Sequence, residues 1–470
     1  MKPISFYSTH KKFLSDVHTP VGIYLRLRDY YRDSILLESA DYASNANSFS
    51  IIAVNAVAGI EISSLTQGEK KLPGKEAKSF TIQEGEAVVT LEQFRQRFVA
   101  NENATNIEKM AQGLFGYCSY DSVALFEHIL TSDEIKPPNI PLIRYRLYQY
   151  VIIINHFNDD MYVVENHFNG VESQIDTLLA KITSRDLPSF PFQKSGDISC
   201  NTTDEEYLQM VGKGIDACKT GEVFQIVLSR CYQQQFKGDD FNVYRALRSI
   251  NPSPYLFYFD YGDYKIAGSS PEAQVICKKS EVIMHPIAGT VLKTGDESID
   301  AEKTADLRAD EKENAEHIML LDLARNDLSR IANNVHLNKD REVQQFSHVI
   351  HLVSEVKGTI KESATAFQIL ASTFPADTLS GAPKVRAMQI IKELEPTPRS
   401  FYGGIIGFIG FDGSVNHAII IRSFLSMYNT ITLQAGAGIV AKSLPENELQ
   451  EVQNKLQALF NAIDAATEIN

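Results

Sequence analysis

Two glutamates one helical turn apart, Glu313 and Glu316, have a type and spacing that indicate chemistry. They lie in the segment 310–331, DEKENAEHIMLLDLARNDLSRI, which lacks glycine and proline and consists mostly of good helix formers. Residues three apart share a helix face, so the two carboxylates repel each other unless a cation lies between them. A hard cation such as Mg²⁺ would remove that repulsion. A solvated acidic edge on an ordinary helix explains the pattern equally well.

Other charged residues occupy positions where they could form ion pairs. Glu451 and Lys455 are four apart in the helical pattern PENELQEVQNKL; a surface ion pair is the simpler interpretation of these two. Arg422 stands within the apolar run HAIIIRS, where a buried guanidinium needs a carboxylate partner.

Two glycine-containing segments could present backbone N–H groups to an anion. In 378–388, TLSGAPKVRAM, a loop enters a helix, although most such entries are structural. In 434–441, QAGAGIVA, the G-x-G-x-x-A pattern is not a dinucleotide fingerprint, because the next helix begins only near Pro445. What remains is a backbone cradle suited to a carboxylate.

The elements that must hold these groups differ along the chain. Residues 1–185 read as short strands separated by turns, and the segment 184–201, with two prolines and no periodicity, predicts a linker. We therefore expect one region over 1–190 and another over 200–470. The expected strands of the first region are Val21–Arg26, Ser34–Leu37, Phe49–Val57, Ala87–Thr90, Arg144–Asn155 and Asp160–Asn166. Beyond the linker the pattern predicts a helix over 203–220 capped by Asp204, then a strand over 221–232 that carries the polar Gln225.

Composition restricts the class of protein. With 470 residues, 44% of them hydrophobic, the chain can build a sizeable core. A net charge of −14 argues against general affinity for nucleic acid or an anionic membrane. The five cysteines lack metal-like spacing, and no apolar run is long enough to span a bilayer. We expect a soluble, cytoplasmic protein whose partners are small molecules or proteins.

A set of segments in fixed order carries a family resemblance. They are LLES, NPSPYLFYF, GSSPE, PIAGT, DEKENAEHIMLLDLARNDLSRI, VIHLVS, TLSGAPKVRAM, YGGIIGF, IIIRS, QAGAGIVA and PENELQEVQNKL, across residues 34–460. The sequence resembles the chorismate-utilising enzymes, most closely the large subunits of anthranilate synthases. The resemblance implies an α+β fold of packed antiparallel sheets with helices on the outside, in which the N-terminal region contributes strands to the same body.

The resemblance also implies roles for individual residues. Glu316 and Glu451 match the family's Mg²⁺ ligands, with Glu313 and Glu448 beside them. His351 and Glu272 match the residues that assist proton transfer and protonate the leaving hydroxyl. Those that match the chorismate pocket are Gly289, Thr290, Thr378, Tyr402, Arg422, Gly436, Ala437, Gly438 and Lys455.

An effector site is implied as well. Ser39, after LLE, and Pro254, Tyr255 and Leu256, in NPSPYL, match the positions at which tryptophan inhibits members of the family. The segment that follows, ADYASNANSFSIIA, departs from the usual pattern because it lacks a basic residue near its Ser-Phe.

Two positions bear on which chorismate reaction is expected. Relatives that add water at C2 carry a lysine base where this chain has Gln225, and relatives that aminate C4 often carry a lysine where it has Ala288. We therefore expect Mg²⁺-dependent attack of ammonia at C2 and loss of pyruvate to give anthranilate, with C4 amination as the alternative. None of the cysteines lies in a G-x-C-x-G setting, so a separate glutamine amidotransferase is the expected partner.

Two other classes compete with this interpretation. A non-catalytic, tryptophan-sensing relative would lose its metal acids or histidine, whereas Glu316, Glu451 and His351 are all present. A nucleotide-binding dehydrogenase is suggested only by the glycines near 436.

Overall fold

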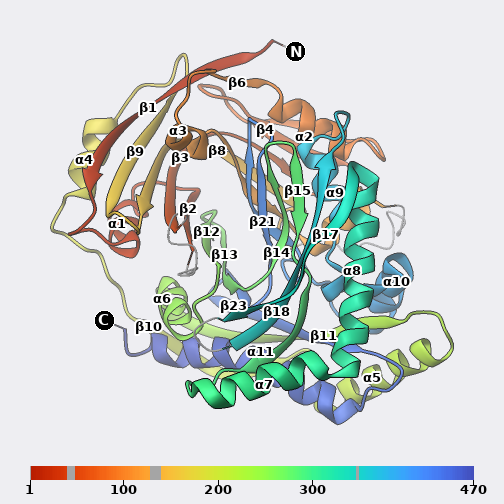
Figure 1. The fold of residues 1–470 in the computed structure, drawn as a ribbon. Helices are drawn as coiled ribbons and strands as arrows, with labels where there is room; N and C mark the ends of the chain where they lie inside the picture. The colour runs from red at the N-terminus through yellow and green to blue at the C-terminus, as the bar shows by residue number, and fades with distance from the viewer. Residues whose placement is uncertain (1, 40–47, 128–138, 346–348, 470) are drawn as a thin grey trace.

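The structure, a computed structural model, describes residues 2–39, 48–127, 139–345 and 349–469. Strands fill the middle of the molecule and most helices lie around them (Figure 1). The first part of the chain forms β1 (Ile4–Leu14), α1 (Pro20–Leu27), β2 (Ser34–Glu38), β3 (Phe49–Ile62), β4 (Gln67–Lys71), β5 (Lys78–Thr81), α2 (Ala87–Arg95), β6 (Phe98–Ala100), α3 (Asn106–Ala111), β7 (Gly113–Cys118), the 3₁₀ helix η1 (Tyr120–Leu125), β8 (Ile143–Asn155), β9 (Asp160–His167) and α4 (Ile175–Ile182).

The second part carries most of the predicted site. It forms β10 (Phe192–Cys200), α5 (Asp204–Lys219), β11 (Gln225–Gly238), α6 (Phe241–Ile250), β12 (Tyr255–Asp260), β13 (Tyr264–Ser270), β14 (Ala273–Lys278), β15 (Glu281–Met284), β16 (Ile287–Leu292), α7 (Glu297–Ala309), α8 (Glu311–Ile331), β17 (Ala332–Gln345), β18 (Val349–Ile360), α9 (Ala366–Thr373), η3 (Asp377–Leu379), β19 (Gly381–Ala382), α10 (Lys384–Leu394), β20 (Ile405–Gly410), β21 (Val415–Ile419), β22 (Ser423–Met427), β23 (Thr430–Ile439) and α11 (Pro445–Ala466).

Antiparallel pairing joins the two parts into one ladder of strands. Its order is β10, β11, β23, β22, β13, β12, β2, β3, β8, β7, β20, β21, β14, β15 and β18. Strands β2, β3, β8 and β7, from before residue 190, therefore lie between β12 and β20, which come after it. The predicted α+β class with antiparallel sheets is confirmed.

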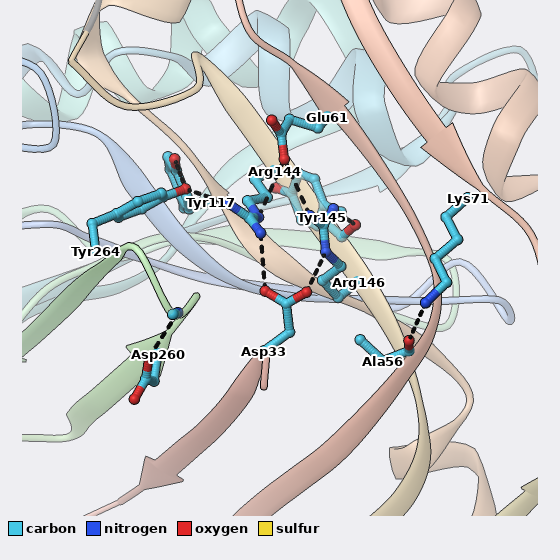
Figure 2. A network of polar contacts seen from close by, with 11 residues as sticks. Asp33, Ala56, Glu61, Lys71, Tyr117, Arg144, Tyr145, Arg146, Asp260 and Tyr264 are labelled. Atoms are coloured by element: carbon cyan, nitrogen blue, oxygen red, sulfur yellow. Dashed lines mark hydrogen bonds and ion pairs between the residues drawn. The ribbon is translucent and has the colours of Figure 1, made fainter. Parts of the chain in front are cut away.

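A half-buried set of ion pairs fixes the N-terminal strands against one another and against β13 (Figure 2). Asp33, just before β2, accepts from Arg144 at 3.0 Å and lies 3.3 Å from Nε of Arg146, both on β8. Glu61 on β3 lies 3.1 Å from Nη2 of Arg146. The Arg144 guanidinium also lies over the ring of Tyr264 on β13. Because each arginine meets both carboxylates, the four charges hold these strands in one register.

The hydrophobic core draws on both parts of the chain. One cluster contains Phe115 and Tyr148 from the N-terminal strands together with Phe257, Ile266 and Ile406 from the later ones. A second cluster lies under α5, α6 and α11, where Val452, Leu456, Leu459 and Ile463 form the expected stripe of the last helix. No helix in the described part of the chain is long and apolar enough to cross a membrane.

Several predicted elements are correct, and the helix over 310–331 is the clearest of them. It forms as α8, and α11 begins at Pro445 as expected. The predicted helix over 203–220 forms as α5, but its cap is Thr203, whose hydroxyl accepts from Glu206 N–H while the Glu206 side chain accepts from Thr203 N–H. This reciprocal capping box satisfies two backbone N–H groups, so the helix is capped by Thr203 and not by Asp204.

Three predicted elements are wrong. The strand expected at 21–26 is the helix α1, because Thr19 caps it and Pro20 suits its first turn. The strand expected at 87–90 is the start of α2. Part of the expected linker is the edge strand β10, which pairs with β11. Most of its side chains are exposed, so it lacks the alternation that identifies a strand in sequence.

Candidate active site

Glu272 lies where the chain passes from β13 to β14. Its backbone is fixed by Ile419 N–H, which donates to its carbonyl at 3.1 Å. Its carboxylate accepts from the Thr378 hydroxyl at 3.2 Å. Burial raises the pKa of Glu272 to about 7, against the opposing effects of the Thr378 hydrogen bond and the Lys455 charge. The group can therefore hold a proton near neutral pH and release it to a substrate oxygen.

Lys455 on α11 contacts three of the predicted site residues. Its ammonium lies 2.6 Å from Oε1 of Glu451, one turn earlier, and donates to the Gly436 carbonyl at 2.9 Å. Its own carbonyl accepts from Nη1 of Arg422 at 2.8 Å. The surface ion pair that the sequence favoured does form, and it lies within the same cluster as the predicted substrate groups.

Arg422 and Tyr402 lie in this cluster. The backbone of Arg422 has φ = 49°, a left-handed conformation that is uncommon for a non-glycine residue. Burial lowers the pKa of its guanidinium, and the nearby Tyr402 and Glu451 oppose that effect. Tyr402 is buried, which raises the pKa of its phenol, and its oxygen accepts from Gly436 N–H. Both backbone groups of Gly436 thus bond to predicted pocket residues, the N–H to Tyr402 and the carbonyl to Lys455.

The glycines of QAGAGIVA are required by close packing between strands. In the pairing of β23 with β11, Gly436 lies opposite Ser229 and Gly438 opposite Val227. A Cβ at Gly436 would lie 2.7 Å from the Leu228 carbonyl oxygen, and one at Gly438 would lie 2.7 Å from Nε2 of Gln225. A side chain at Gly436 would therefore shift β11, whereas one at Gly438 would displace only the Gln225 amide. Ala437, between them, is fully buried.

Gln225 connects this strand to α8. Its amide Nε2 donates to Oε1 of Glu316 at 3.3 Å. The neutral residue that stands where water-adding relatives carry lysine therefore faces one of the two predicted metal ligands. Nothing is described for the side chain of Glu313, and at Ala288 and Thr290 only the backbone is described.

His351 lies on β18, buried and paired through its backbone with Thr290 of β16. Burial lowers its pKa and the positive charge of Arg422 lowers it further, while a hydrogen bond to the Gly289 carbonyl opposes both. The imidazole is therefore neutral at pH 7 and able to accept a proton. Gly289 has φ = 56°, a left-handed conformation that suits glycine.

The predicted effector residues also come together, beside β13, whose Ser269 pairs with Leu256 and donates to the Arg422 carbonyl. Ser39 follows β2, and Glu38 of that strand pairs with Leu256 of β12, so Ser39 and Pro254–Leu256 lie at adjoining strand ends. Glu38 is buried and accepts from Arg248 at 2.9 and 2.8 Å and from Tyr244 at 2.8 Å. The segment 40–47, in which the missing basic residue was noted, is outside the described residues.

The structure adds residues that sequence reasoning missed. Arg399 is buried, donates to both oxygens of Glu395 and lies against the rings of Tyr120 and Tyr402. It also donates to the Leu379 carbonyl, beside Thr378. The sequence gives no signal for these contacts except an arginine and a glutamate four residues apart.

The two predicted metal ligands have suitable chemistry but do not form a preassembled cage. Among the residues the structure describes, no group of three or more histidine, cysteine, aspartate or glutamate side chains has metal-binding spacing. Mg²⁺ commonly takes one or two carboxylates and completes its shell with water and substrate oxygens. Glu316 and Glu451 fit such a set, since both are carboxylates and buried Glu448 lies on the same helix as Glu451.

Comparisons with known proteins agree with this geometry. A sequence model described as chorismate binding enzyme matches residues 59–461. The chain therefore belongs to the chorismate-binding enzyme family, as the resemblance implied, and it is an enzyme. It is 36% identical to anthranilate synthase component 1 of Aquifex aeolicus, over 98% of this chain and 95% of that protein. It is 35% identical to the component 1 of Thermus thermophilus, over 97% of each chain.

Solved structures give the same result. Anthranilate synthase component I from Streptococcus pneumoniae superimposes with a TM-score of 0.74 at 31% identity, covering 96% of this chain and 99% of that one. The menaquinone-specific isochorismate synthase of Escherichia coli has a TM-score of 0.73 at 18% identity, covering 98% and 96%, and shares the fold.

Proposed function

We propose that this chain catalyses the amination of chorismate at C2 with ammonia and the elimination of pyruvate, which yields anthranilate. The observation that carries this choice is Gln225, whose amide contacts Glu316. An amide has no basic lone pair to take a proton from water, so activation of water at this position is disfavoured. Ammonia is itself a nucleophile and needs no base of that kind.

The chain's own residues supply binding and proton transfer. Arg422 and Lys455 offer positive charge for the substrate's carboxylates, and the Gly436–Gly438 backbone, whose Gly436 N–H is held by the Tyr402 oxygen, lies beside them. Glu272, protonated near neutral pH, donates its proton to the 4-hydroxyl as that group leaves as water. Neutral His351, near Arg422, assists proton transfer.

Mg²⁺ is proposed as the cofactor, held by Glu316 and Glu451. When bound, it supplies positive charge that neutralises the ring carboxylate and polarises the ring towards attack. The Glu451 oxygen that contacts Lys455 and the Glu316 oxygen that contacts Gln225 are the proposed metal ligands. Binding of the metal would replace an ion pair at Glu451 and a hydrogen bond at Glu316.

Two partners and a location complete the proposal. A glutamine amidotransferase subunit supplies ammonia; the relatives' name, component 1, supports a second component. Tryptophan binds at Ser39 and Pro254–Leu256, and the pairing of β2 with β12 that joins these segments supports a shared pocket. All five cysteines are free thiols, which supports a reducing, cytoplasmic location.

Product identification tests the reaction. Purified chain is incubated with chorismate, Mg²⁺ and ammonium, and products are separated by chromatography with fluorescence detection. We expect anthranilate as the main product, and none when glutamine replaces ammonium without an amidotransferase. A C4-aminated product would favour aminodeoxychorismate synthesis instead, and isochorismate would contradict the argument from Gln225.

A further inference from the structure

A small hollow lies behind Glu272, next to α8 and η3. Its volume is about 40 Å³, and Gln274, His285 and Asp377 are among the polar residues that line it with Glu272. It adjoins the proposed substrate pocket through Glu272 and Thr378, whereas Arg422, Lys455 and His351 do not border it. A site needs roughly 10–15 Å³ of such volume and two to four polar partners to hold a water molecule. This hollow satisfies the first condition.

Its walls also contain polar atoms whose hydrogen bonding is incomplete. Oε1 of Gln274 is buried and accepts no hydrogen bond from a described residue, and Oδ1 of Asp377 is buried with only a 3.4 Å ion pair to Lys384. The Gln274 side chain is held in place because its amide donates to the Thr373 carbonyl. A buried acceptor without a donor is unfavourable, so water in the hollow would stabilise the Gln274 oxygen and could also donate to Asp377.

Asp377 is suited to carry a proton. The Lys384 ammonium lies 2.8 Å from Asp327 and 3.4 Å from Asp377, so one positive charge serves two buried carboxylates. The surplus negative charge favours uptake of one proton, and the more distant Asp377 is the group that takes it. Burial raises the pKa of Asp377 to about 6, with the Asp327 charge acting in the same direction and Lys384 and Arg330 against it.

His285 links the hollow to solvent. Its side chain is 27% exposed, and its Nε2 lies 3.4 Å from a carboxylate oxygen of Glu355. Burial lowers its pKa below 6.5, the Glu355 charge opposes that shift, and Lys339 and Lys278 add to it. Together with Glu272, which faces Thr378 and the Lys455 charge, and Asp377, the hollow is lined by three groups that can each hold or release a proton.

We propose that water in this hollow relays a proton from Asp377 to Glu272 after each turnover. This inference rests on the proposed function, in which Glu272 gives its proton to the leaving hydroxyl and becomes a carboxylate. The O–H bond of Asp377 then breaks, the water passes on one of its own protons, and an O–H bond forms on Glu272. The Asp377 carboxylate recovers a proton from His285, and His285 recovers its proton from solvent.

The test is rapid-quench kinetics on Asp377→Asn, which keeps the shape of the side chain but cannot relay a proton. Enzyme with Glu272 already protonated completes its first turnover at the wild-type rate, and every later turnover waits for a proton. We therefore expect a burst of anthranilate, then a steady-state rate roughly tenfold lower, with KM lowered in proportion and kcat/KM unchanged. At pH 7 the burst should equal about half of the enzyme, because the pKa of Glu272 is about 7.

Two further variants separate the relay from a structural role. Asp327→Asn leaves the hollow unchanged but removes the charge that favours a proton on Asp377, so it should also slow the steady state after a burst. Ala324→Val keeps Asp377 but fills the hollow from α8, so it should reproduce the burst if Asp377→Asn fails to fold. A larger solvent deuterium effect on the slow phase than on the burst distinguishes slow proton delivery from slow product release.

The outcomes are distinct. A wild-type chain that makes no anthranilate contradicts the proposed function. If the wild type is active, a slow first turnover in Asp377→Asn shows that Asp377 has a structural role. An unchanged steady-state rate shows that Glu272 is reprotonated by another route. Either result overturns the relay.

Discussion

Replacing Arg399 with methionine should destabilise the fold severely and disturb the pocket. The guanidinium donates to Glu395 at 2.9 and 2.6 Å, to the Leu379 carbonyl at 2.5 Å and to the Val227 carbonyl at 2.7 Å. Removing one partner of a buried pair costs about 3–5 kcal/mol, and each carbonyl that loses its donor adds about 1 kcal/mol. We expect a loss of about 5 kcal/mol, a large part of the 5–15 kcal/mol typical of folded domains.

The double variant Glu395→Gln/Arg399→Met is the matched control. The glutamine amide removes the stranded charge and can still accept from Ser229, whose N–H lies 2.8 Å from the Glu395 carboxylate. It should therefore recover about 2 kcal/mol of the loss. Because the chain has no tryptophan, urea unfolding is best followed by far-UV circular dichroism. A single variant that loses less than about 1 kcal/mol, or a double variant no more stable than the single one, would refute this reasoning.

Three other predictions concern the site. Glu316→Gln should abolish activity at all Mg²⁺ concentrations while the unfolding midpoint without metal stays the same or rises; full turnover in millimolar Mg²⁺ would disprove the metal assignment. Ser39→Phe should fill the proposed effector pocket and relieve inhibition by tryptophan with little loss of activity, measured as the inhibition constant; an unchanged constant places the effector elsewhere. The pKa of Glu272 is raised to about 7, so between pH 4.5 and 7 the folded chain binds more protons than the unfolded chain. Ionisation of this carboxyl therefore lowers the stability of the folded chain as pH rises through that window. Activity should fall over the same rise through pH 7, and Glu272→Gln should lose activity while its melting temperature exceeds that of the wild type at pH 8 but not at pH 4.

The sequence predicts best where a local pattern determines the structure. The helix over 310–331 follows from its composition, and the rejection of a dinucleotide site follows from the distance between the glycines and Pro445. The ion pair of Glu451 and Lys455 follows from helical spacing. The error over α1 has a local cause too, since an apolar run of this length suits a strand or a helix equally well.

What the sequence cannot supply is contact between distant segments. Arg399 meets Val227 across 172 positions, and Lys384 meets Asp327 across 57. Such pairs depend on the order of strands in the ladder, which residue types and spacing do not determine. The family resemblance supplies roles for Glu272 and His351, but the raised pKa of one and the lowered pKa of the other come from burial, which only the folded chain defines.

The insertion of β2 between β12 and β3 has a consequence for how this chain can be divided. In the intact fold, β2 satisfies the backbone groups along one side of β12 from Leu256 to Asp260. A fragment that began at β10 would leave that side without hydrogen-bond partners, flanked by the apolar Phe257 and Phe259. Unpaired strands of this kind recruit other chains and promote aggregation. The N-terminal residues thus cover a strand edge that would otherwise aggregate. Expression of the C-terminal region alone should require that a substitute strand be supplied.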